Sequence, residues 1–345
     1  MPRPLVPDTP GKERLHNLLA AVHGADRALI VPHNDPDPDA IASSAAMRFL
    51  LTIKAGLECR LAFRGLIGRA ENKALVKYLG CPFHILRDSD YQDAGTALIF
   101  IDTQPGAGNN PVPLKYRARV VIDHHPRRPS ADTAVYTDIR TNGGTCSTIM
   151  TGYLREADLE PDPQLATALF YGIQTDTRSL SRDVTPSDSK AYFYLQTRVD
   201  VEALAEIENA QVPAEYFRSL SATLNAVRIY RDVVMVYIGN TTYPDIAAEM
   251  ADFLLRLERI RWVICMDTFK ETLFISVRTR DRRGGADDLI EDMIGMDGTY
   301  GGHEMTAGGQ VPLNGRAPQE VVSKLQQRAL SHLGIPPDLS GTPLI

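Results

Sequence analysis

The chain has 345 residues, of which 43% are apolar and 23% are charged, and its formal net charge is −6. This length predicts two domains, and the composition is typical of a soluble globular protein. The acidic balance argues against broad binding to long nucleic acid, because neutralising many phosphates requires a basic surface. It leaves open a small anionic substrate that binds at one local site.

The sequence contains no run with the length of a membrane span, and residues 1–30 lack the basic-then-apolar layout of a signal peptide. The four cysteines, at positions 59, 81, 146 and 265, form neither a CxxC pair nor a zinc-finger spacing. We expect reduced thiols, a cytoplasmic location and no membrane partner.

The first half of the chain alternates helical patterns with short apolar runs. The expected helices are 12–23, 38–51, 71–79, 145–157 and 163–174, the last beginning at Pro163. The expected strands are 27–32, 59–63, 96–102 and 118–125. Continuous apolar strands between helices are typical of a buried parallel sheet.

From residue 182 to about 221 the chain turns polar and helical, which predicts a connector. Strands are expected at 233–239, 262–267 and 272–279, and helices at 244–257, 286–294 and 318–330. A glycine-rich loop is expected between the last two helices, and a loosely ordered tail follows Gly334. We therefore predict an α/β domain at 1–185, a helical connector at 186–224 and a smaller α/β domain at 225–345.

Acidic and histidine residues follow the apolar runs of the first half directly. The stretch "HNDPDPDA" after the first strand supplies His33, Asp37 and Asp39. The other positions of this kind are Asp102, the triplet Asp123-His124-His125, and Asp176 at the end of a helix. Binding sites in open parallel sheets lie beyond the carboxyl ends of the strands, so these side chains are expected to converge.

Clustered carboxylates repel one another unless a cation lies between them. Imidazole and carboxylate ligands together suit Mn²⁺, Fe²⁺ or Zn²⁺, and an oxygen-rich set favours Mn²⁺ or Mg²⁺. Five or six such ligands exceed what one ion with open positions needs, which indicates a pair of ions. Taken singly, each aspartate is better explained as a turn or helix-cap residue, and His124 as a core histidine. A metal site is favoured because such residues occur at all four of these positions along the chain.

These motifs resemble the DHH phosphoesterase superfamily, named for its Asp-His-His triplet. "HNDPDPDA" matches its first motif, "IFIDT" at Asp102 its second, and "GIQTDT" at Asp176 its fourth. "FISVRT" and "GTYGGHEMTAGG" are similar to the DHH-associated C-terminal domain, although Tyr300 stands where a further glycine is common. The resemblance implies an N-terminal parallel-sheet DHH domain, a smaller C-terminal α/β domain, and an active site in the interdomain cleft.

The same resemblance implies a role for each site residue. His33, Asp37 and Asp102 would hold one divalent ion, and Asp39, Asp102, His124 and Asp176 a second. The expected ions are Mn²⁺, with Mg²⁺ or Fe²⁺ as alternatives. His125 would face the scissile phosphate and Asp123 would orient the histidines, these two being the catalytic pair. Asp35 is expected to lie outside the ligand set.

The substrate-binding residues implied in the second domain are Arg278, Gly301, Gly302 and His303. The guanidinium group of arginine can bind two phosphate oxygens at once, and glycine lets backbone N–H groups approach an anion closely. Each of these motifs alone is explained equally well by a turn or a strand end. Arg280, Arg282 and Arg283 stay undecided between a solvated hairpin and a substrate contact, and Ser147 is expected to be a cap or packing residue.

The leading hypothesis is a metal-dependent phosphoesterase that hydrolyses short RNA or DNA oligonucleotides, similar to the oligoribonuclease (nanoRNase) branch. Members of that branch also dephosphorylate 3′-phosphoadenosine 5′-phosphate. The alternative is a phosphodiesterase for cyclic di-AMP or its linear product pApA, because the motifs are shared. An inorganic pyrophosphatase and a non-catalytic nucleotide sensor are less favoured. The sequence leaves a homodimer open.

Overall fold

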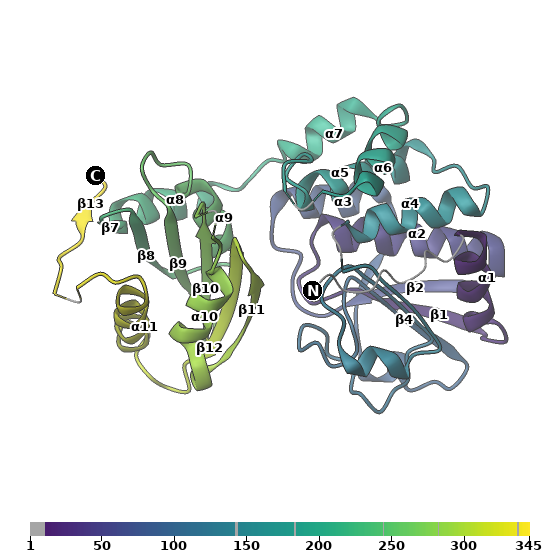
Figure 1. Cartoon of the computed structure of the whole chain (residues 1–345), viewed down its shortest axis with the longest axis horizontal. Helices are drawn as coiled ribbons and strands as arrows, with labels where there is room; N and C mark the ends of the chain where they lie inside the picture. Colours follow the sequence, from purple (N-terminus) through teal and green to yellow (C-terminus); the bar gives the residue numbers. More distant parts are fainter. Residues whose placement is uncertain (1–10, 142–143, 183, 244, 282, 337) are drawn as a thin grey trace, which may run out of the picture. The chain divides into compact units, whose positions relative to one another are not determined.

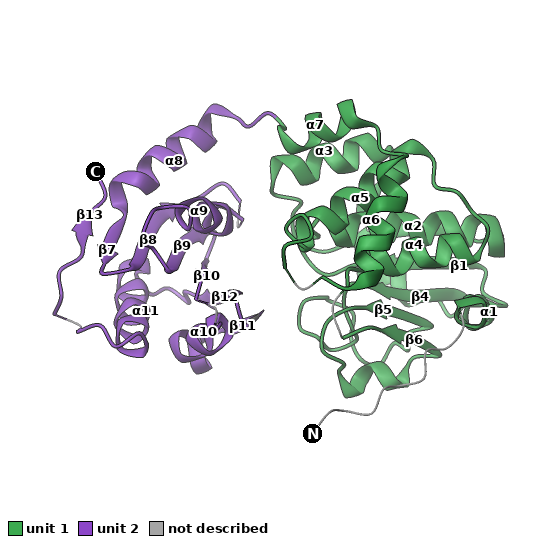
Figure 2. Ribbon diagram, turned by 45° about the horizontal axis from the view of Figure 1, so that its top comes forward, with its two compact units in different colours: residues 1–210 green, residues 211–345 purple. Residues whose placement is uncertain are grey.

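The structure is a computed structural model that describes residues 11–141, 144–182, 184–243, 245–281, 283–336 and 338–345. The chain divides into two compact units, residues 1–210 and residues 211–345 (Figure 2). Within the described ranges, no helix is both long enough and apolar enough to cross a lipid bilayer.

The first unit is built on a six-stranded sheet with the order β3-β2-β1-β4-β5-β6, and every neighbouring pair is parallel (Figure 1). The strands are β1 (Arg27–Val31), β2 (Glu58–Phe63), β3 (Phe83–Ile85), β4 (Thr96–Ile101), β5 (Val120–Asp123) and β6 (Tyr136–Ile139). The strand order reverses between β1 and β4, because the chain leaves β1 towards β2 and later returns to its other side. In open sheets, such a switch point leaves a crevice at the carboxyl ends of the two strands.

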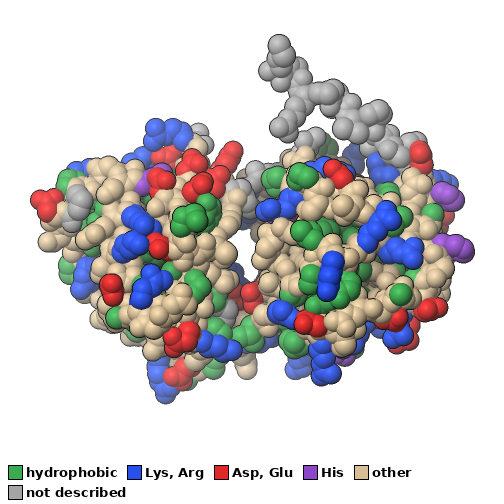
Figure 3. All heavy atoms as spheres, turned by 90° about the horizontal axis from the view of Figure 1, so that it is seen from below, with side chains coloured by type: hydrophobic (Ala, Val, Ile, Leu, Met, Phe, Trp, Pro, Cys, Tyr) green, Lys and Arg blue, Asp and Glu red, His purple; other side chains and the backbone are tan. Residues whose placement is uncertain are grey.

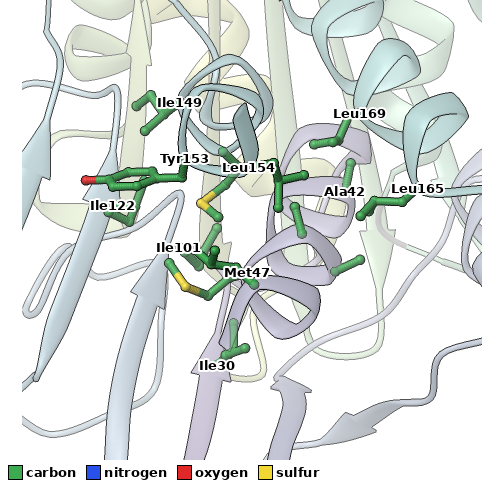
Figure 4. Packing of buried hydrophobic residues seen from close by; sticks show 14 of the residues in the cluster. Ile30, Ala42, Met47, Ile101, Ile122, Ile149, Tyr153, Leu154, Leu165 and Leu169 are labelled. Atoms are coloured by element: carbon green, nitrogen blue, oxygen red, sulfur yellow. The ribbon is translucent and has the colours of Figure 1, made fainter. Parts of the chain in front are cut away.

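Helices cover one face of this sheet. They are α1 (Gly11–Val22), α2 (Pro38–Ala55), α3 (Ala70–Leu79), α4 (Cys146–Glu156), α5 (Pro163–Asp176), α6 (Pro186–Gln196) and α7 (Val201–Glu208). Figure 4 shows Ile30, Ile101 and Ile122 of the strands packed against Met47 of α2 and Ile149 of α4. The opposite face buries Leu29, Leu98 and Phe100 under loops and the short 3₁₀ helices η1 (Asp88–Tyr91) and η2 (Pro129–Thr133). The continuous apolar strands therefore reflect burial on both faces.

The boundary between the units falls inside the segment expected to be a connector. Helices α6 and α7 belong to the first unit, where Tyr192 packs its ring on Phe170 at 4.2 Å and Ile207 is buried in the core. Helix α8 (Ala214–Ala226) belongs to the second unit, where Leu220 and Leu224 pack against its core. Helices α6 and α7 pack on other helices of the first unit, and α8 packs against the core of the second.

The second unit contains a seven-stranded sheet with the order β11-β12-β10-β9-β8-β7-β13, in which only β8 and β9 are parallel. Its strands are β7 (Arg228–Tyr230), β8 (Val233–Asn240), β9 (Trp262–Phe269), β10 (Thr272–Thr279), β11 (Thr299–His303), β12 (Thr306–Pro312) and β13 (Thr342–Pro343). Helices α8 and α9 (Ile246–Leu254) cover one face. Helices α10 (Ala286–Ile294) and α11 (Pro318–His332) cover the other, and η3 (Gly295–Asp297) follows α10.

The expected glycine-rich loop is wrong, because this segment forms the β11–β12 hairpin at the edge of the sheet. Gly302 and Gly309 are needed there for close packing. A Cβ at Gly302 would lie 2.5 Å from the Cα of Ala307, and one at Gly309 would lie 2.9 Å from the carbonyl oxygen of Thr299. The tail is also more ordered than expected, since β13 pairs with β7.

The buried carboxyl of Asp267 on β9 gives the second unit a pH-dependent stability. Burial raises its pKa to about 7, against the opposing effects of the Thr241 hydroxyl at 3.0 Å and the Ala247 N–H. The folded state therefore binds the proton more tightly than the unfolded state, so the free energy of unfolding falls as pH rises from about 4 to about 7. The total is a few kcal/mol, because one pKa unit corresponds to about 1.4 kcal/mol.

We expect Asp267→Asn to flatten this dependence in urea unfolding between pH 5 and pH 8. Trp262 is the single tryptophan of the chain and lies on β9, so its fluorescence reports on this unit. Asp288→Asn, at an exposed position of α10, should leave the slope unchanged. Equal slopes for wild type and Asp267→Asn would contradict the prediction.

Candidate metal centre

The predicted metal ligands converge beyond the carboxyl ends of β1, β4 and β5, at the switch point of the parallel sheet. The donor atoms of His33, Asp37 and Asp102 lie within 4.8 Å of one another, and so do those of Asp39, His124 and Asp176. The loop after β1 and the residue after β4 supply the first of these two groups. The two groups match the two ligand sets implied by the family resemblance, apart from the shared Asp102.

In the first group, the ring of His33 has a defined orientation. Its Nδ1 donates to the carbonyl of Asn34 at 2.7 Å, which leaves Nε2 facing the carboxylates of Asp37 at 3.7 Å and Asp102 at 3.6 Å. A backbone acceptor on one imidazole nitrogen fixes the tautomer that presents the other as a ligand. Asp37 also caps α2 by accepting from the N–H of Ala40 at 2.9 Å. The cap and ligand explanations of Asp37 are therefore compatible.

In the second group, Asp39 is held by the start of α4. Its two carboxylate oxygens accept the N–H groups of Cys146 and Ser147, each at 2.7 Å, and the residue is buried. The Nε2 of His124 lies 3.2 Å from Asp102 and 3.8 Å from Asp176. His124 and Asp102 thus connect the two groups.

Asp176 is the last residue of α5 and is followed by an unusual turn. Arg178, Ser179 and Leu180 all have positive φ, between 46° and 61°. Each costs roughly 1–2 kcal/mol for a residue other than glycine. Hydrogen bonds from Ser179 to the carbonyl of Gln174 and from Ser181 to that of Thr177 hold the turn. A turn fixed in this way sets the position of the Asp176 carboxylate.

Asp123 points into the protein and organises the triplet. It accepts from the N–H of His124 at 2.8 Å, from Nδ1 of His125 at 2.9 Å and from Nε2 of Gln104 at 2.6 Å. A carboxylate occupied in this way orients its neighbours. His125 is 42% exposed, so its ring reaches solvent from the edge of the cluster.

The electrostatics of the cluster favour a cation. Burial lowers the pKa of His33, but the nearby carboxylates of Asp37 and Asp102 outweigh it and raise this pKa to about 10. Burial raises the pKa of Asp176 to about 6, and with the charges of Asp102 and Asp176 it raises the pKa of Asp39 well above its usual range. Carboxylates crowded in a buried site therefore hold protons nearby when no other cation compensates them.

The donor set fits divalent metal ions. Six nitrogen and oxygen donors, from His33, Asp37, Asp39, Asp102, His124 and Asp176, converge there. Ligands bound at about 2.1 Å are separated by about 3.0–3.4 Å in tetrahedral or octahedral geometry. The separations of 3.2–3.8 Å between these histidine and aspartate donor atoms lie near this range, and those of 3.6–3.8 Å exceed ordinary hydrogen bonds. Small shifts would bring them onto an ion.

Asp35 lies in the same loop but serves another purpose. Its φ is 53°, its Oδ1 accepts from the N–H of Leu66 at 2.6 Å, and its own N–H donates to the carbonyl of Arg64. It therefore ties the loop to the segment after β2. In the described chain, it belongs to neither donor group.

We expect Asp35→Asn to be tolerated and Asp37→Asn to weaken metal binding by tenfold or more. Asparagine at 35 keeps an oxygen for Leu66 and tolerates positive φ, and asparagine at 37 remains a good helix cap. Both variants keep their local hydrogen bond. They differ because only Asp37→Asn removes a negative charge from a metal-donor group. Titration calorimetry with Mn²⁺ measures the difference, and equal affinities would contradict the assignment of Asp37.

Two residues near the centre are not among the sequence-predicted site residues. Gln104 links Asp123 to the loop of the triplet, since it also donates to the carbonyl of Pro126 and accepts from the N–H of Arg128. Cys146 is buried with its Sγ 3.6 Å from Asp102. Thr145 rather than Ser147 caps α4, so Ser147 is a packing residue. The sequence did not indicate a role for Gln104 or Cys146, because neither residue lies in a motif typical of metal ligands.

In the second unit, strand register places Arg278 and Gly301 on one face of the sheet and Gly302 on the other. Arg278 pairs with Thr306, and Thr306 pairs with His303, while Ser276 pairs with Gly308, and Gly308 with Gly301. Directly paired residues point to the same side. Arg278 contacts Asp252 of α9, so this is the α9 side of the sheet. The side chain of His303 lies outside the described part of the chain.

Arg278 is buried and held on two sides. Its Nε donates to Asp252 at 2.7 Å, and its Nη1 donates to the Ser276 hydroxyl and the Val277 carbonyl. Among the described residues, none accepts from its Nη2. A Cβ at Gly301 would meet no atom within 4 Å, and one at Gly308 would meet only the Ile275 carbonyl at 3.5 Å. Next to Arg278, the surface of the sheet therefore consists of glycine backbone, and no side chain that the structure describes covers it.

The side chain of Tyr300 does not lie on this face, and those of Arg280 and Arg283 are exposed. Tyr300 points to the opposite side and donates to Glu291 of α10 at 2.9 Å, so its replacement of a glycine leaves the Arg278 side unobstructed. Arg283 is 86% exposed and pairs with Asp281, and Arg280 is exposed. Arg282 lies outside the described residues.

Comparisons with known proteins agree with these observations. The DHH family, N-terminal domain, matches residues 27–173. An uncharacterized protein of Methanocaldococcus jannaschii is 34% identical over 306 residues, covering 88% of this chain and 62% of that protein. The A-adding tRNA nucleotidyltransferase of Geobacter sulfurreducens is 24% identical over 270 residues, covering 73% of this chain and 29% of the enzyme. The chain thus spans less than two thirds of either relative.

The fold has a close counterpart among solved structures. The crystal structure of an exopolyphosphatase-related protein from Bacteroides fragilis superposes with a TM-score of 0.71 at 16% identity, covering 93% of this chain and 96% of that one. This likeness confirms the predicted α/β fold with a parallel-sheet domain and a second α/β domain. The matched residues 27–173 include His33, Asp102 and the Asp123-His124-His125 triplet. The first unit therefore contains a segment, residues 27–173, that matches the N-terminal domain of the DHH family.

Proposed function

We propose that the chain is a divalent-metal-dependent phosphoesterase that hydrolyses short oligonucleotides, and that 3′-phosphoadenosine 5′-phosphate is a further substrate. The observation that carries the proposal is the pair of donor groups, His33-Asp37-Asp102 and Asp39-His124-Asp176, at the switch point of the sheet. When bound there, two divalent cations supply a water of lowered pKa and compensate the charge of a phosphoryl group. Mn²⁺ suits the mixed imidazole and carboxylate donors best.

The chain's own residues have distinct parts in this reaction. Asp102 lies between the two groups and contributes to both. Asp123 holds Nδ1 of His125 at 2.9 Å, which leaves Nε2 of that ring for a phosphate oxygen. The hydrogen bond that Nδ1 of His125 donates to Asp123 and the charge of Asp102 raise the pKa of His125, against the opposing effect of desolvation.

The second unit is proposed to bind an anionic group of the substrate. Arg278 would donate from Nη2, and the backbone at Gly301 and Gly302 would approach the ligand closely, with His303 beside them in register. A short substrate is favoured over long nucleic acid by charge. On the face drawn in Figure 3, lysine and arginine side chains are interspersed with aspartate and glutamate and form no continuous basic stripe.

A substrate panel with Mn²⁺ tests the proposal. The panel comprises pApA, oligoribonucleotides of increasing length, 3′-phosphoadenosine 5′-phosphate, cyclic di-AMP and pyrophosphate. Fastest turnover of pApA and other very short oligoribonucleotides is the expected result. Preference for cyclic di-AMP or pyrophosphate would replace the substrate class, and absence of all turnover would overturn the enzymatic proposal in favour of a nucleotide sensor.

A further inference from the structure

The backbone N–H groups of Cys146, Ser147 and Thr148, at the beginning of α4, all have side-chain acceptors. The first backbone N–H groups of a helix have no partner within the helix. Here those of Cys146 and Ser147 both donate to Asp39, and that of Thr148 donates to the hydroxyl of Thr145 at 3.0 Å. The position of Asp39 is therefore set by the position of the first turn of α4.

That first turn is itself held by Asp188, a buried residue of α6. One carboxylate oxygen of Asp188 accepts the N–H of Thr145 at 3.2 Å and the hydroxyl of Thr148 at 2.6 Å. The other oxygen accepts the N–H and the hydroxyl of Thr185, at 2.8 and 2.6 Å. Asp188 thus joins the starts of α4 and α6 through a single carboxylate with four hydrogen bonds.

We propose that Asp188 is a positioning residue for the metal centre, acting through the first turn of α4 on Asp39. This inference rests on the proposed function, since it concerns how the second ion is held. Asp188 touches no donor of either group, and within the described chain it belongs to neither. A fully buried carboxylate is costly unless it is satisfied, so its two bonds to α4 and two to α6 fix both helices together. Loss of these bonds releases the turn that aims Asp39.

The test separates positioning from general stability. Asp188→Asn keeps the shape of the side chain but gives up acceptor capacity at one of its two ends, and Thr148→Val removes the 2.6 Å bond from the α4 side alone. Asp200→Ala is the matched control, because Asp200 caps α7 by accepting from Ala203 at 3.0 Å and contributes to neither donor group. All three are compared with wild type as full-length protein.

Two measurements are made on each variant. Amide hydrogen exchange of the metal-free protein reports on the N–H groups of Cys146 and Ser147, which should exchange at least tenfold faster in Asp188→Asn and Thr148→Val than in wild type. Calorimetric titration with Mn²⁺ should show binding weakened about tenfold in both variants, with the loss of turnover recovered at high Mn²⁺. Asp200→Ala should lower the melting temperature without either effect.

Unchanged exchange at Cys146 and Ser147 in folded Asp188→Asn would overturn the inference. So would Mn²⁺ affinity equal to that of wild type in both variants. If the wild-type protein binds no Mn²⁺, the proposed function fails, and the exchange measurement still decides whether Asp188 holds the turn. The two failures are therefore distinguishable.

Discussion

Replacing Asp102 by asparagine is expected to lower Mn²⁺-dependent hydrolysis on the order of a thousandfold or more, while the protein stays folded. Asp102 is buried and its carboxylate faces three imidazoles, with Nε2 of His33 at 3.6 Å, Nε2 of His124 at 3.2 Å and Nδ1 of His125 at 3.5 Å. Asp102 belongs to the first donor group and lies 3.2 Å from His124 of the second, so losing its charge is expected to remove several kcal/mol of stabilisation from the reaction. Steady-state kinetics with pApA and calorimetry with Mn²⁺ measure the two effects.

Asparagine is a more informative replacement for Asp102 than alanine, because the backbone at this position has a positive φ. Asp102 has a φ of 57°, a conformation that asparagine adopts readily and alanine does not. Its N–H also donates to the carbonyl of Ile122 at 2.9 Å, so the local turn should persist in Asp102→Asn. Asp35→Asn, also at positive φ, is the matched control. Activity of Asp102→Asn within a few-fold of wild type would contradict the two-ion assignment.

The second large effect is expected from valine substitutions at two adjacent glycines of β11, which should have different consequences. Gly301→Val is expected to raise the KM for the short nucleotide at least tenfold without lowering the melting temperature. The new Cβ would meet no atom within 4 Å, valine suits a strand, and its side chain would occupy the open face beside Arg278. The same change at Gly302 should unfold the hairpin, because a Cβ there lies 2.5 Å from the Cα of Ala307 and 2.6 Å from the carbonyl of Thr306.

Overpacking of this kind costs about 1–3 kcal/mol. Thermal unfolding and KM measured on both variants give the two readouts. A Gly301→Val protein with unchanged KM would show that no ligand approaches this face. A Gly302→Val protein as stable as wild type would contradict the packing argument.

Much of the first unit could be predicted from the sequence, because its signals are strong and local. Continuous apolar runs such as the one ending at Ile101 are buried on both sides of the sheet, and Pro163 begins a helix as expected. The convergence of the acidic residues followed from one general rule about parallel sheets. The strand order, and with it the switch point between β1 and β4, needed the structure, because it depends on pairing between distant segments.

The second unit and the supporting residues were harder to predict for physical reasons. Glycine has a low propensity for strands, so local sequence does not predict the β11–β12 hairpin. The hairpin is specified instead by its pairing with β10 and by the close packing at Gly302. Asp188 and Gln104 act through hydrogen bonds to residues about 40 and 20 positions away. Polar side chains of this kind have no periodicity, and only the folded chain shows their partners.

The pairing of β1 with β4 also has a kinetic consequence. Donors of the first group come from positions 33 to 102, and those of the second from positions 39 to 176, so neither group exists in a locally folded fragment. Long-range parallel pairing closes large loops and is slow compared with local helix formation. An ion that needs both segments would bind only after the sheet has closed. It would then stabilise the native state by mass action and slow its opening.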